Sequence, residues 1–204
     1  CSVVALVVGL AVCGAAEAAG GDAGPGFAVR RVSGEAQMWW ARALADIDGD
    51  GLLDIALQDD NARGGWLGWL QAQEGLGAWT RHVIAETAPD GGTFACGDQE
   101  AGDVDGDGDV DVFAFSHPGE WDQGGAETTV YWYENPSWKA HRIGTCPAFV
   151  KDVAAADFNG DGRLDLVATT FVRNSVTVFR QDSPAKWTAV QEMTVKNLHE
   201  GMDV

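Results

Sequence analysis

Basic residues are scarce in this 204-residue sequence. Lys and Arg number 13 against 31 Asp and Glu, which gives a formal charge of −18 and a pI near 4.3. Nucleic acids and anionic membrane surfaces both attract positively charged patches. The composition therefore argues against either of them as a partner.

Long hydrophobic runs are also missing. The apolar stretch at residues 3–12 is too short to span a bilayer. Together with the small-x-small sequence at 16–18, it predicts a secretory signal segment over residues 1–20, followed by a linker over 21–26. Lipidation at Cys13 is disfavoured because bulky Val12 precedes it. We expect a secreted, periplasmic or cell-surface protein that is not inserted in the membrane once the signal is removed.

Cysteine is sparse as well. Two of the four cysteines lie in the expected signal segment, which leaves Cys96 and Cys146. An even pair in an exported protein fits a disulfide, and it fits a pair of small buried thiols equally well. The sequence leaves both interpretations open.

Common catalytic motifs do not occur in the sequence. It contains no Gly-x-Ser-x-Gly, no His-Glu-x-x-His and no phosphate-binding glycine loop. His82 and His141 recur at equivalent points of the chain, which is typical of a structural role. No window shows a convincing helical period, so the sequence also lacks the main signal for helices.

What the sequence does contain is one acidic loop in three copies, at residues 46–54 (loop one), 103–111 (loop two) and 157–165 (loop three). The copies begin 57 and 54 residues apart, and a near-constant period of this size indicates a repeat architecture. Each loop has oxygen-bearing side chains at positions 1, 3, 5 and 9, with Gly at position 6. Hard cations such as calcium need this donor set and this sharp turn.

Short β-branched and apolar runs surround each loop and are separated by Gly, Pro, Asn and Asp. One run precedes each loop and three follow it, so we expect four strands in each unit. The sequence predicts an all-β fold, a β-propeller of four-stranded blades, with blades at about 38–92, 95–147 and 148–198. A strand at 27–32 would close the ring, and further blades of the same chain would complete it at the C-terminal end. We expect these 204 residues alone to be poorly stable because closure shields the edge strands.

The Asp-x-Asp-Gly-Asp-Gly-x-x-Asp loops, the segment Tyr131-Trp132-Tyr133-Glu134-Asn135-Pro136 and the Trp-x-x-His runs resemble the FG-GAP/VCBS repeat family. The resemblance covers residues 27–204 and implies propeller repeats like those of integrin α-chain heads. It implies about three calcium sites, with side-chain ligands at Asp46, Asp48, Asp50, Asp54, Asp103, Asp105, Asp107, Asp111, Asp157, Asn159, Asp161 and Asp165. Backbone carbonyls at position 7 would add Leu52, Asp109 and Arg163.

An EF-hand is excluded because position 12 of the loops is Leu57, Ala114 or Ala168 instead of Glu. Without that bidentate ligand, we expect weak calcium affinity, on the order of 10⁻⁴ to 10⁻³ M. The alternative is a set of solvated Asp-Gly turns that hold no metal.

A ligand-binding face is predicted around an insertion in the second unit. His117, Glu120, Trp121 and Asp122 bring together an imidazole, two carboxylates and an indole, which suits sugar binding or acid–base work, and a plain solvated loop is the alternative. Packing between blades is the expected role of Trp66, Trp69, Trp79, Trp132, Trp138 and Trp187. Exposed positions remain plausible for Trp39, Trp40 and Trp121.

Two functions are compatible with this sequence. The first is a calcium-stabilised binding or adhesion module for an extracellular protein or glycan. The second is the propeller of a secreted carbohydrate-active lyase or dehydratase. The motifs of the chain leave open whether it is an enzyme.

Overall fold

The fold was analysed in a computed structural model, which describes residues 42–58, 65–118, 126–171 and 173–194. The chain divides into two compact units, Cys1–Arg30 and Arg31–Val204, and all described residues lie in the second. Within the described ranges, no helix has both the length and the apolar character that crossing a membrane requires.

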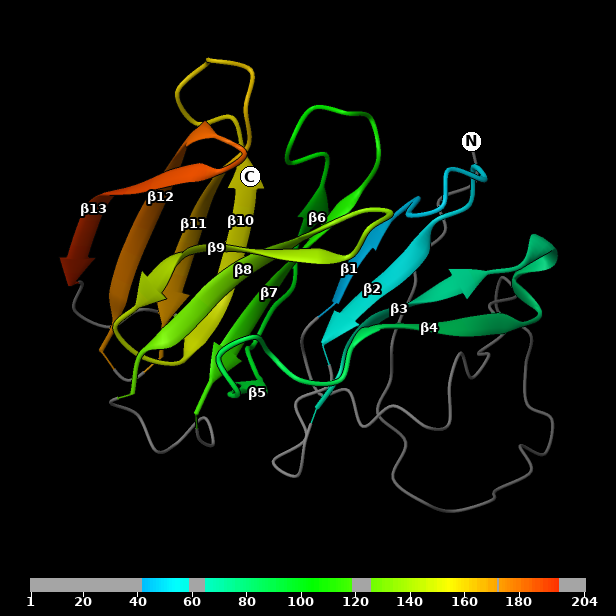
Figure 1. The fold of residues 1–204 in the computed structure, drawn as a ribbon, viewed down its shortest axis with the longest axis horizontal. Helices are drawn as coiled ribbons and strands as arrows, with labels where there is room; N and C mark the ends of the chain where they lie inside the picture. Colours follow the sequence, from blue (N-terminus) through cyan, green and yellow to red (C-terminus); the bar gives the residue numbers. More distant parts are fainter. Residues whose placement is uncertain (1–41, 59–64, 119–125, 172, 195–204) are drawn as a thin grey trace, which may run out of the picture. The chain divides into compact units, whose positions relative to one another are not determined.

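Three antiparallel sheets follow one another along the chain (Figure 1). Sheet A, blue to teal in Figure 1, consists in spatial order of β1 (Arg42–Ala45), β2 (Asp54–Gln58), β3 (Leu67–Ala72) and β4 (Trp79–Ala85). Sheet C, yellow to red, consists of β10 (Val150–Ala156), β11 (Asp165–Thr170), β12 (Ser175–Ser183) and β13 (Lys186–Thr194). In both sheets each strand pairs with the next one in sequence, so the connections are simple hairpins.

Sheet B, in the green range of Figure 1, differs from sheets A and C at its first strand position, which two short strands share. It contains β7 (Asp111–His117), β8 (Thr128–Glu134) and β9 (Lys139–Cys146), with both β5 (Thr93–Phe94) and β6 (Ala101–Gly102) on the free side of β7. The sheet therefore has five strands where four were expected. The chain leaves the ladder between β5 and β6, and there the N–H of Gly97 donates to the carbonyl of Val150 in sheet C.

The prediction of an all-β fold is confirmed. The runs expected as strands at each side of the three loops all form strands, and the described residues contain no α-helix, only the short 3₁₀ turn η1 (Glu74–Leu76). Alternation explains why the central residues of β7 and β8 in sheet B, 112–115 and 130–133, are all apolar or aromatic. Successive side chains of a strand point to opposite faces, and both faces of this sheet are buried.

Sheet B contributes to two hydrophobic cores. Phe113, Phe115 and Trp132 pack in a core with Leu166 and Phe179 of sheet C. The alternate residues of the same strands, such as Val112 and Tyr131, pack with Ala56, Leu67 and Trp69 of sheet A. The expected packing of tryptophans between sheets is present for four of the six, because Trp69 and Trp132 are buried in these cores and Trp138 and Trp187 border them. Trp66 and Trp79 instead border a smaller cluster within sheet A.

Buried side-chain amides also join the sheets. Gln58 at the end of β2 bonds Phe115 of β7 twice, donating from Nε2 to the carbonyl at 2.7 Å and accepting its N–H at 3.0 Å. Both groups are buried, so each hydrogen bond satisfies a polar atom that water cannot reach. Close approach is required at Gly144 too, where a Cβ atom would lie 2.7 Å from the ring of Phe179.

The two equivalent histidines pack on equivalent tryptophans. His82 stacks on Trp69 with ring centroids 4.2 Å apart, and His141 stacks on Trp132 at 4.3 Å. In each case the histidine lies directly opposite the tryptophan across the outer strand pair. These contacts give both imidazoles a packing role in the sheets.

Cys96 and Cys146 are buried thiols in the core between sheets B and C. The Cys96 Sγ donates to the carbonyl of Asp98 at 2.6 Å, and burial raises the pKa of Cys146 to about 12. Of the two interpretations left open by the sequence, the structure has the pair of buried thiols.

Candidate metal centres in the acidic loops

Each acidic loop connects the first strand position of its sheet to the second. Loop one joins β1 to β2, loop two joins β6 to β7, and loop three joins β10 to β11. Positions 4 and 6 have positive φ in every copy, from 73° at Gly49 to 99° at Gly108. Glycine adopts this backbone without strain, which explains why both positions carry it in all three loops.

Backbone N–H groups of the loop point inward at the carboxylates. The position 1 aspartate accepts the N–H of position 6 in each copy, at 2.9 Å for Asp46, 3.1 Å for Asp103 and 2.8 Å for Asp157. The position 5 aspartate accepts the N–H of position 7 in the same way. The loops are therefore wound around their own acidic side chains, which orients the carboxylates before any ligand arrives.

The position 9 aspartates are buried, unlike most of the loop. Asp54 Oδ2 accepts the N–H of Ile47 at 3.0 Å and its Oδ1 accepts that of Ala72 at 2.8 Å. Asp111 has the same two partners in its own repeat, Val104 at 2.9 Å and Asn135 at 2.8 Å. This aspartate therefore ties the loop to the end of the third strand of its sheet.

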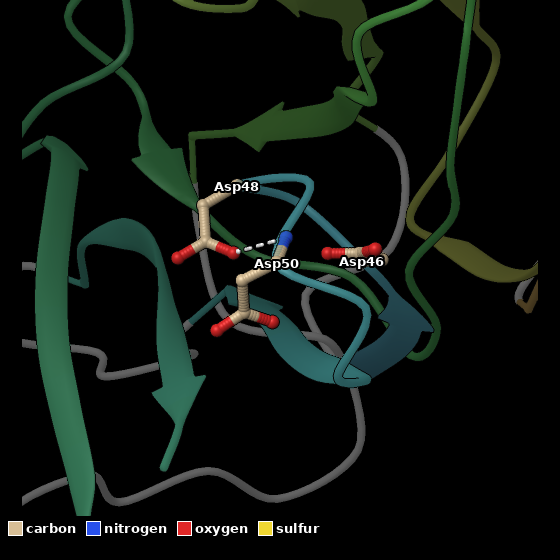
Figure 2. Close-up of side chains that lie close together, drawn as sticks. All are labelled: Asp46, Asp48 and Asp50. Atoms are coloured by element: carbon tan, nitrogen blue, oxygen red, sulfur yellow. Dashed lines mark hydrogen bonds between the residues drawn. The ribbon is translucent and has the colours of Figure 1, made fainter. Parts of the chain in front are cut away.

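Loop one brings three carboxylates together. Asp46, Asp48 and Asp50 each place one oxygen within 4.8 Å of the others, and Figure 2 shows the three side chains gathered in the loop. The Oδ1 atom of Asp46 is buried and has no hydrogen-bond partner. Asp54 lies behind this group, and its pKa is raised by burial, with a further contribution from the charges of Asp48 and Asp50.

Loop two forms a second group from a different set of positions. Here Asp103, Asp105 and the buried Asp111 each offer an oxygen within 4.8 Å of one another. Burial raises the pKa of Asp111 to about 7, and the nearby charges of Asp105 and Asp107 act in the same direction. A cation beside these carboxylates would reverse that destabilisation of the ionised form.

Loop three has the same backbone but a different arrangement of side chains. Asn159 at position 3 turns its amide to Asp165 and donates to Oδ2 at 3.1 Å. Arg163 at position 7 forms an ion pair with Asp161 at 2.5 Å and donates from Nε to the carbonyl of Gln181. Among the described residues, groups of three metal-ligating side chains occur in loops one and two, and the acidic residues of loop three form no such group.

Loops one and two fit a hard divalent cation. Two oxygens that each lie about 2.4 Å from one calcium ion are at most about 4.8 Å apart. The carboxylates of both groups meet this limit without any rearrangement. The unpaired buried oxygen of Asp46 is a further match, because a buried carboxylate oxygen without a donor is costly unless something else compensates it. Loop three does not fit in this arrangement, since its arginine occupies one of the predicted ligands.

The predicted ligand-binding face is only partly within the described residues. His117 is fully buried at the end of β7, where Nε2 bonds the carbonyl of Ala126 and the ring packs edge-on against Phe149. Its imidazole is therefore part of the packed structure in this arrangement and does not face solvent. Glu120, Trp121 and Asp122 lie outside the described residues, as do Trp39 and Trp40.

Three amide side chains at the loops were not predicted from the sequence. Gln71 donates from Nε2 to Asp48 of loop one and bonds His82 through Oε1 at 3.0 Å. Asn135 and Gln181 reach from the third strand position of one sheet to the acidic loop of the preceding repeat. All three lie at or just after the end of a strand that pairs with the strand following a loop, which is the one shared signal in the sequence.

Comparison with known proteins identifies the middle of the chain. Residues 103–168, from the first aspartate of loop two into β11, match a family model described as an FG-GAP-like repeat. A search of curated proteins found no match for the chain, and neither did a search of solved structures. The match agrees with the resemblance of the loops and strands to FG-GAP/VCBS repeats. The chain is therefore a protein that contains an FG-GAP-like repeat.

Proposed function

We propose that this protein is an exported binding module whose three sheets are blades of a calcium-stabilised β-propeller. Its partner would be an extracellular protein or glycan, and calcium would serve structure instead of chemistry. Extracellular sites of this kind work with affinities of about 10⁻⁴ to 10⁻³ M.

The arrangement of the strands supports the propeller. The three sheets occur in sequence order, and the strands of sheets A and C run in order from the first position to the fourth. Sheet B shares one core with sheet A and another with sheet C, so consecutive sheets pack in series. The FG-GAP-like repeat at residues 103–168 supports the same architecture. Radial repetition of this kind leaves only short edges unprotected.

The convergence of carboxylates in loops one and two is the observation that carries the calcium proposal. Like charges at this separation repel each other, and in a partly buried site water screens them less than in bulk. A divalent cation converts this repulsion into attraction and fixes the loop between its two strands. Binding to the folded state alone then adds to the free energy of unfolding.

Melting curves of the full-length protein in EDTA, in 10 mM calcium and in 10 mM magnesium test this proposal. With the affinity given above, 10 mM calcium stabilises the chain by about 1.4–2.7 kcal/mol for each occupied loop. We expect calcium to raise the melting temperature by several degrees and magnesium to raise it less, because magnesium demands a more regular octahedral site. Identical curves in EDTA and calcium would contradict the proposal.

A charge-matched pair of variants sharpens the measurement. Asp48→Asn with Asp105→Asn removes one carboxylate from each ligand group, and we expect it to abolish the calcium effect. Asp109→Asn with Glu86→Gln removes the same charge from exposed side chains outside the two groups and should keep the effect. Equal responses of the two double variants would assign the calcium effect to the overall acidity of the chain.

The binding role needs a separate experiment. A glycan array and an array of extracellular matrix proteins, probed with the chain in calcium, test the proposed class of partner. We expect calcium-dependent retention on one of the two, because the loops hold the strands that carry the connecting segments. No retention on either array would argue against a protein or glycan partner.

A further inference from the structure

The three acidic loops are joined by one continuous series of hydrogen bonds. Its members alternate between a position 9 aspartate, the backbone of a position 2 residue and an amide side chain of the next repeat. In order they are Asp54, Ile47, Asn135, Asp111, Val104, Gln181 and Asp165. We call this series the relay.

The first half of the relay connects loop one with loop two. The N–H of Ile47 donates to Asp54 at 3.0 Å, and the carbonyl of Ile47 accepts Asn135 Nδ2 at 2.8 Å. The backbone N–H of Asn135 in turn donates to Asp111 Oδ1 at 2.8 Å. Because Ile47 lies between the ligand candidates Asp46 and Asp48, the backbone of one metal loop is two hydrogen bonds away from Asp111 of the other.

The second half repeats the connection from loop two to loop three. Val104 donates to Asp111 at 2.9 Å and accepts Gln181 Nε2 at 2.8 Å. The backbone N–H of Gln181 then donates to Asp165 at 2.9 Å. All seven residues are buried, so water cannot replace a partner that moves away.

We propose that the relay couples the acidic loops, so that a cation bound in loop one raises the cation affinity of loop two. This inference rests on the proposed calcium sites. A cation in loop one fixes the backbone between positions 1 and 3, and with it the direction of the Ile47 carbonyl. That carbonyl holds Asn135, and Asn135 holds Asp111 in the orientation in which its oxygen joins Asp103 and Asp105.

The size of the coupling follows from the number of bonds. Between loops one and two, the relay transmits through a single side-chain hydrogen bond, the one from Asn135 to Ile47. A buried hydrogen bond changes an equilibrium by roughly twofold to tenfold. Coupling is reciprocal, so loop two must affect loop one by the same factor.

Site-resolved calcium titrations of the full-length protein test the relay. The N–H of Gly106 donates to Asp103 in loop two, and Gly49 holds the same position in loop one, so their NMR amide signals report each loop separately. Disabling loop one with Asp50→Ala is expected to raise the calcium midpoint at Gly106 by about twofold to tenfold. Disabling loop two with Asp105→Ala is expected to raise the midpoint at Gly49 by the same factor.

Asn135→Leu separates the relay from the electrostatic effect of charges in the two loops. This change keeps the size of the side chain and all charges but removes the amide that donates to Ile47 and to Val110 of loop two, so the Gly106 midpoints with and without Asp50→Ala are compared within the Asn135→Leu background. In the Asn135→Leu background, Asp50→Ala should no longer shift the calcium midpoint at Gly106. All titrations are done in 0.3 M KCl, which screens the charges of the two loops from each other. If Asn135→Leu loses the native NMR spectrum, Asn135→Ser is used instead, because it removes the same side-chain amide.

Gln58→Met is the matched control. Gln58 also joins sheets A and B through a buried amide, but it bonds Phe115 at the far end of β2 and takes no part in the relay. We expect this variant to keep the full coupling. Loss of coupling in Gln58→Met would overturn the relay in favour of a general effect of the interface between the sheets.

The outcomes distinguish the relay from the calcium proposal. Calcium-dependent shifts at Gly49 and Gly106 with an unchanged Gly106 midpoint in Asp50→Ala would overturn the relay and leave the calcium sites standing. A Gly106 midpoint that still shifts in Asn135→Leu would also overturn it. No shift at either glycine in 10 mM calcium would overturn both proposals.

Discussion

Loops two and three share the same glycine turns and differ in two of their polar side chains, at positions 3 and 7. Both turn on two glycines with positive φ, and in both the position 1 aspartate accepts the N–H groups of positions 4 and 6. Loop two carries five carboxylates, whereas loop three has an asparagine at position 3 and an arginine at position 7. Loop two brings three carboxylate oxygens within 4.8 Å of one another, whereas in loop three Arg163 pairs with Asp161.

This difference separates two roles of the acidic residues. The position 9 aspartate is buried in both loops and accepts the N–H of Asn135 or Gln181 in the third strand position. Its structural role therefore persists in the loop where the ligand group is missing. The proposed cation would add to a loop that hydrogen bonds already hold in shape.

The largest expected effect tests the role that the two loops share. Asp111→Ala leaves the buried N–H groups of Val104 and Asn135 without an acceptor, at about 1–3 kcal/mol each. Relief of repulsion in loop two offsets part of this cost. We expect the free energy of unfolding in calcium-free urea titrations to fall by about 2–4 kcal/mol. Asp165→Ala should also be costly, because Gln181 loses its acceptor.

Calcium then distinguishes the two variants. Asp165→Ala should keep the calcium-dependent rise in melting temperature. Asp111→Ala should lose the part of this rise that calcium binding in loop two contributes. Asp109→Ala, an exposed change in the same loop, is the control and should alter stability by less than about 0.5 kcal/mol. If Asp111→Ala melts like Asp109→Ala, the position 9 aspartate does not hold the loop.

The second prediction converts loop three into a copy of loop two. Asn159→Asp removes the amide that occupies Asp165, and Arg163→Leu frees Asp161 from its ion pair. We expect the double variant to bind one more calcium ion in isothermal titration calorimetry. Its melting temperature in 10 mM calcium should rise by a further amount corresponding to about 1.4–2.7 kcal/mol.

Arg180→Leu is the control for the lost positive charge. Arg180 lies on β12 and pairs with Asp182 outside the loop, so its removal takes away the same single positive charge as Arg163→Leu. We expect no change in calcium stoichiometry from this variant. If Arg180→Leu and the converted loop gain calcium equally, the two side chains of loop three are not what prevents binding.

Much of this comparison was predictable from the sequence. The period, the strands and the glycines follow from local patterns, because turn geometry and alternation are properties of neighbouring residues. The asparagine and arginine of loop three are visible in the sequence as well. Their effect on the loop was not predictable, because Arg163 donates to the carbonyl of Gln181, which lies on another strand 18 residues away in the sequence.

Contacts between repeats were harder still to predict. Asn135 bonds a residue 88 positions away, and Gln181 one 77 positions away. No local pattern marks such partners, since they depend on how one sheet packs on the next. The split first position of sheet B has the same origin, because Gly97 leaves its own ladder for Val150 of sheet C. The sequence was informative within a repeat and nearly silent between repeats.

The smallest expected effect comes from Glu100, a carboxyl near the acidic loops, and its titration must be separated from that of the loop carboxylates. Glu100 precedes β6, and burial raises its pKa to about 7, with the charge of Asp98 acting in the same direction. It faces β10, whose Ala155 N–H donates to it, while Asp152 and Arg42 act on the neighbouring Asp98. A carboxyl whose pKa is higher in the folded state than its usual 4.5 binds its proton more tightly there.

Glu100 therefore makes the folded state more stable in acid. Its contribution to the free energy of unfolding should decline as the pH rises from about 4.5 to about 7 and stay constant above that. Because the side chain is partly exposed, solvent screening reduces the effect to about 1 kcal/mol. Urea titrations in EDTA at pH 5 and pH 8 should show this difference between the wild type and Glu100→Gln. The acidic loops titrate in both proteins, so the subtraction removes them, and parallel pH profiles would mean that Glu100 has an ordinary pKa.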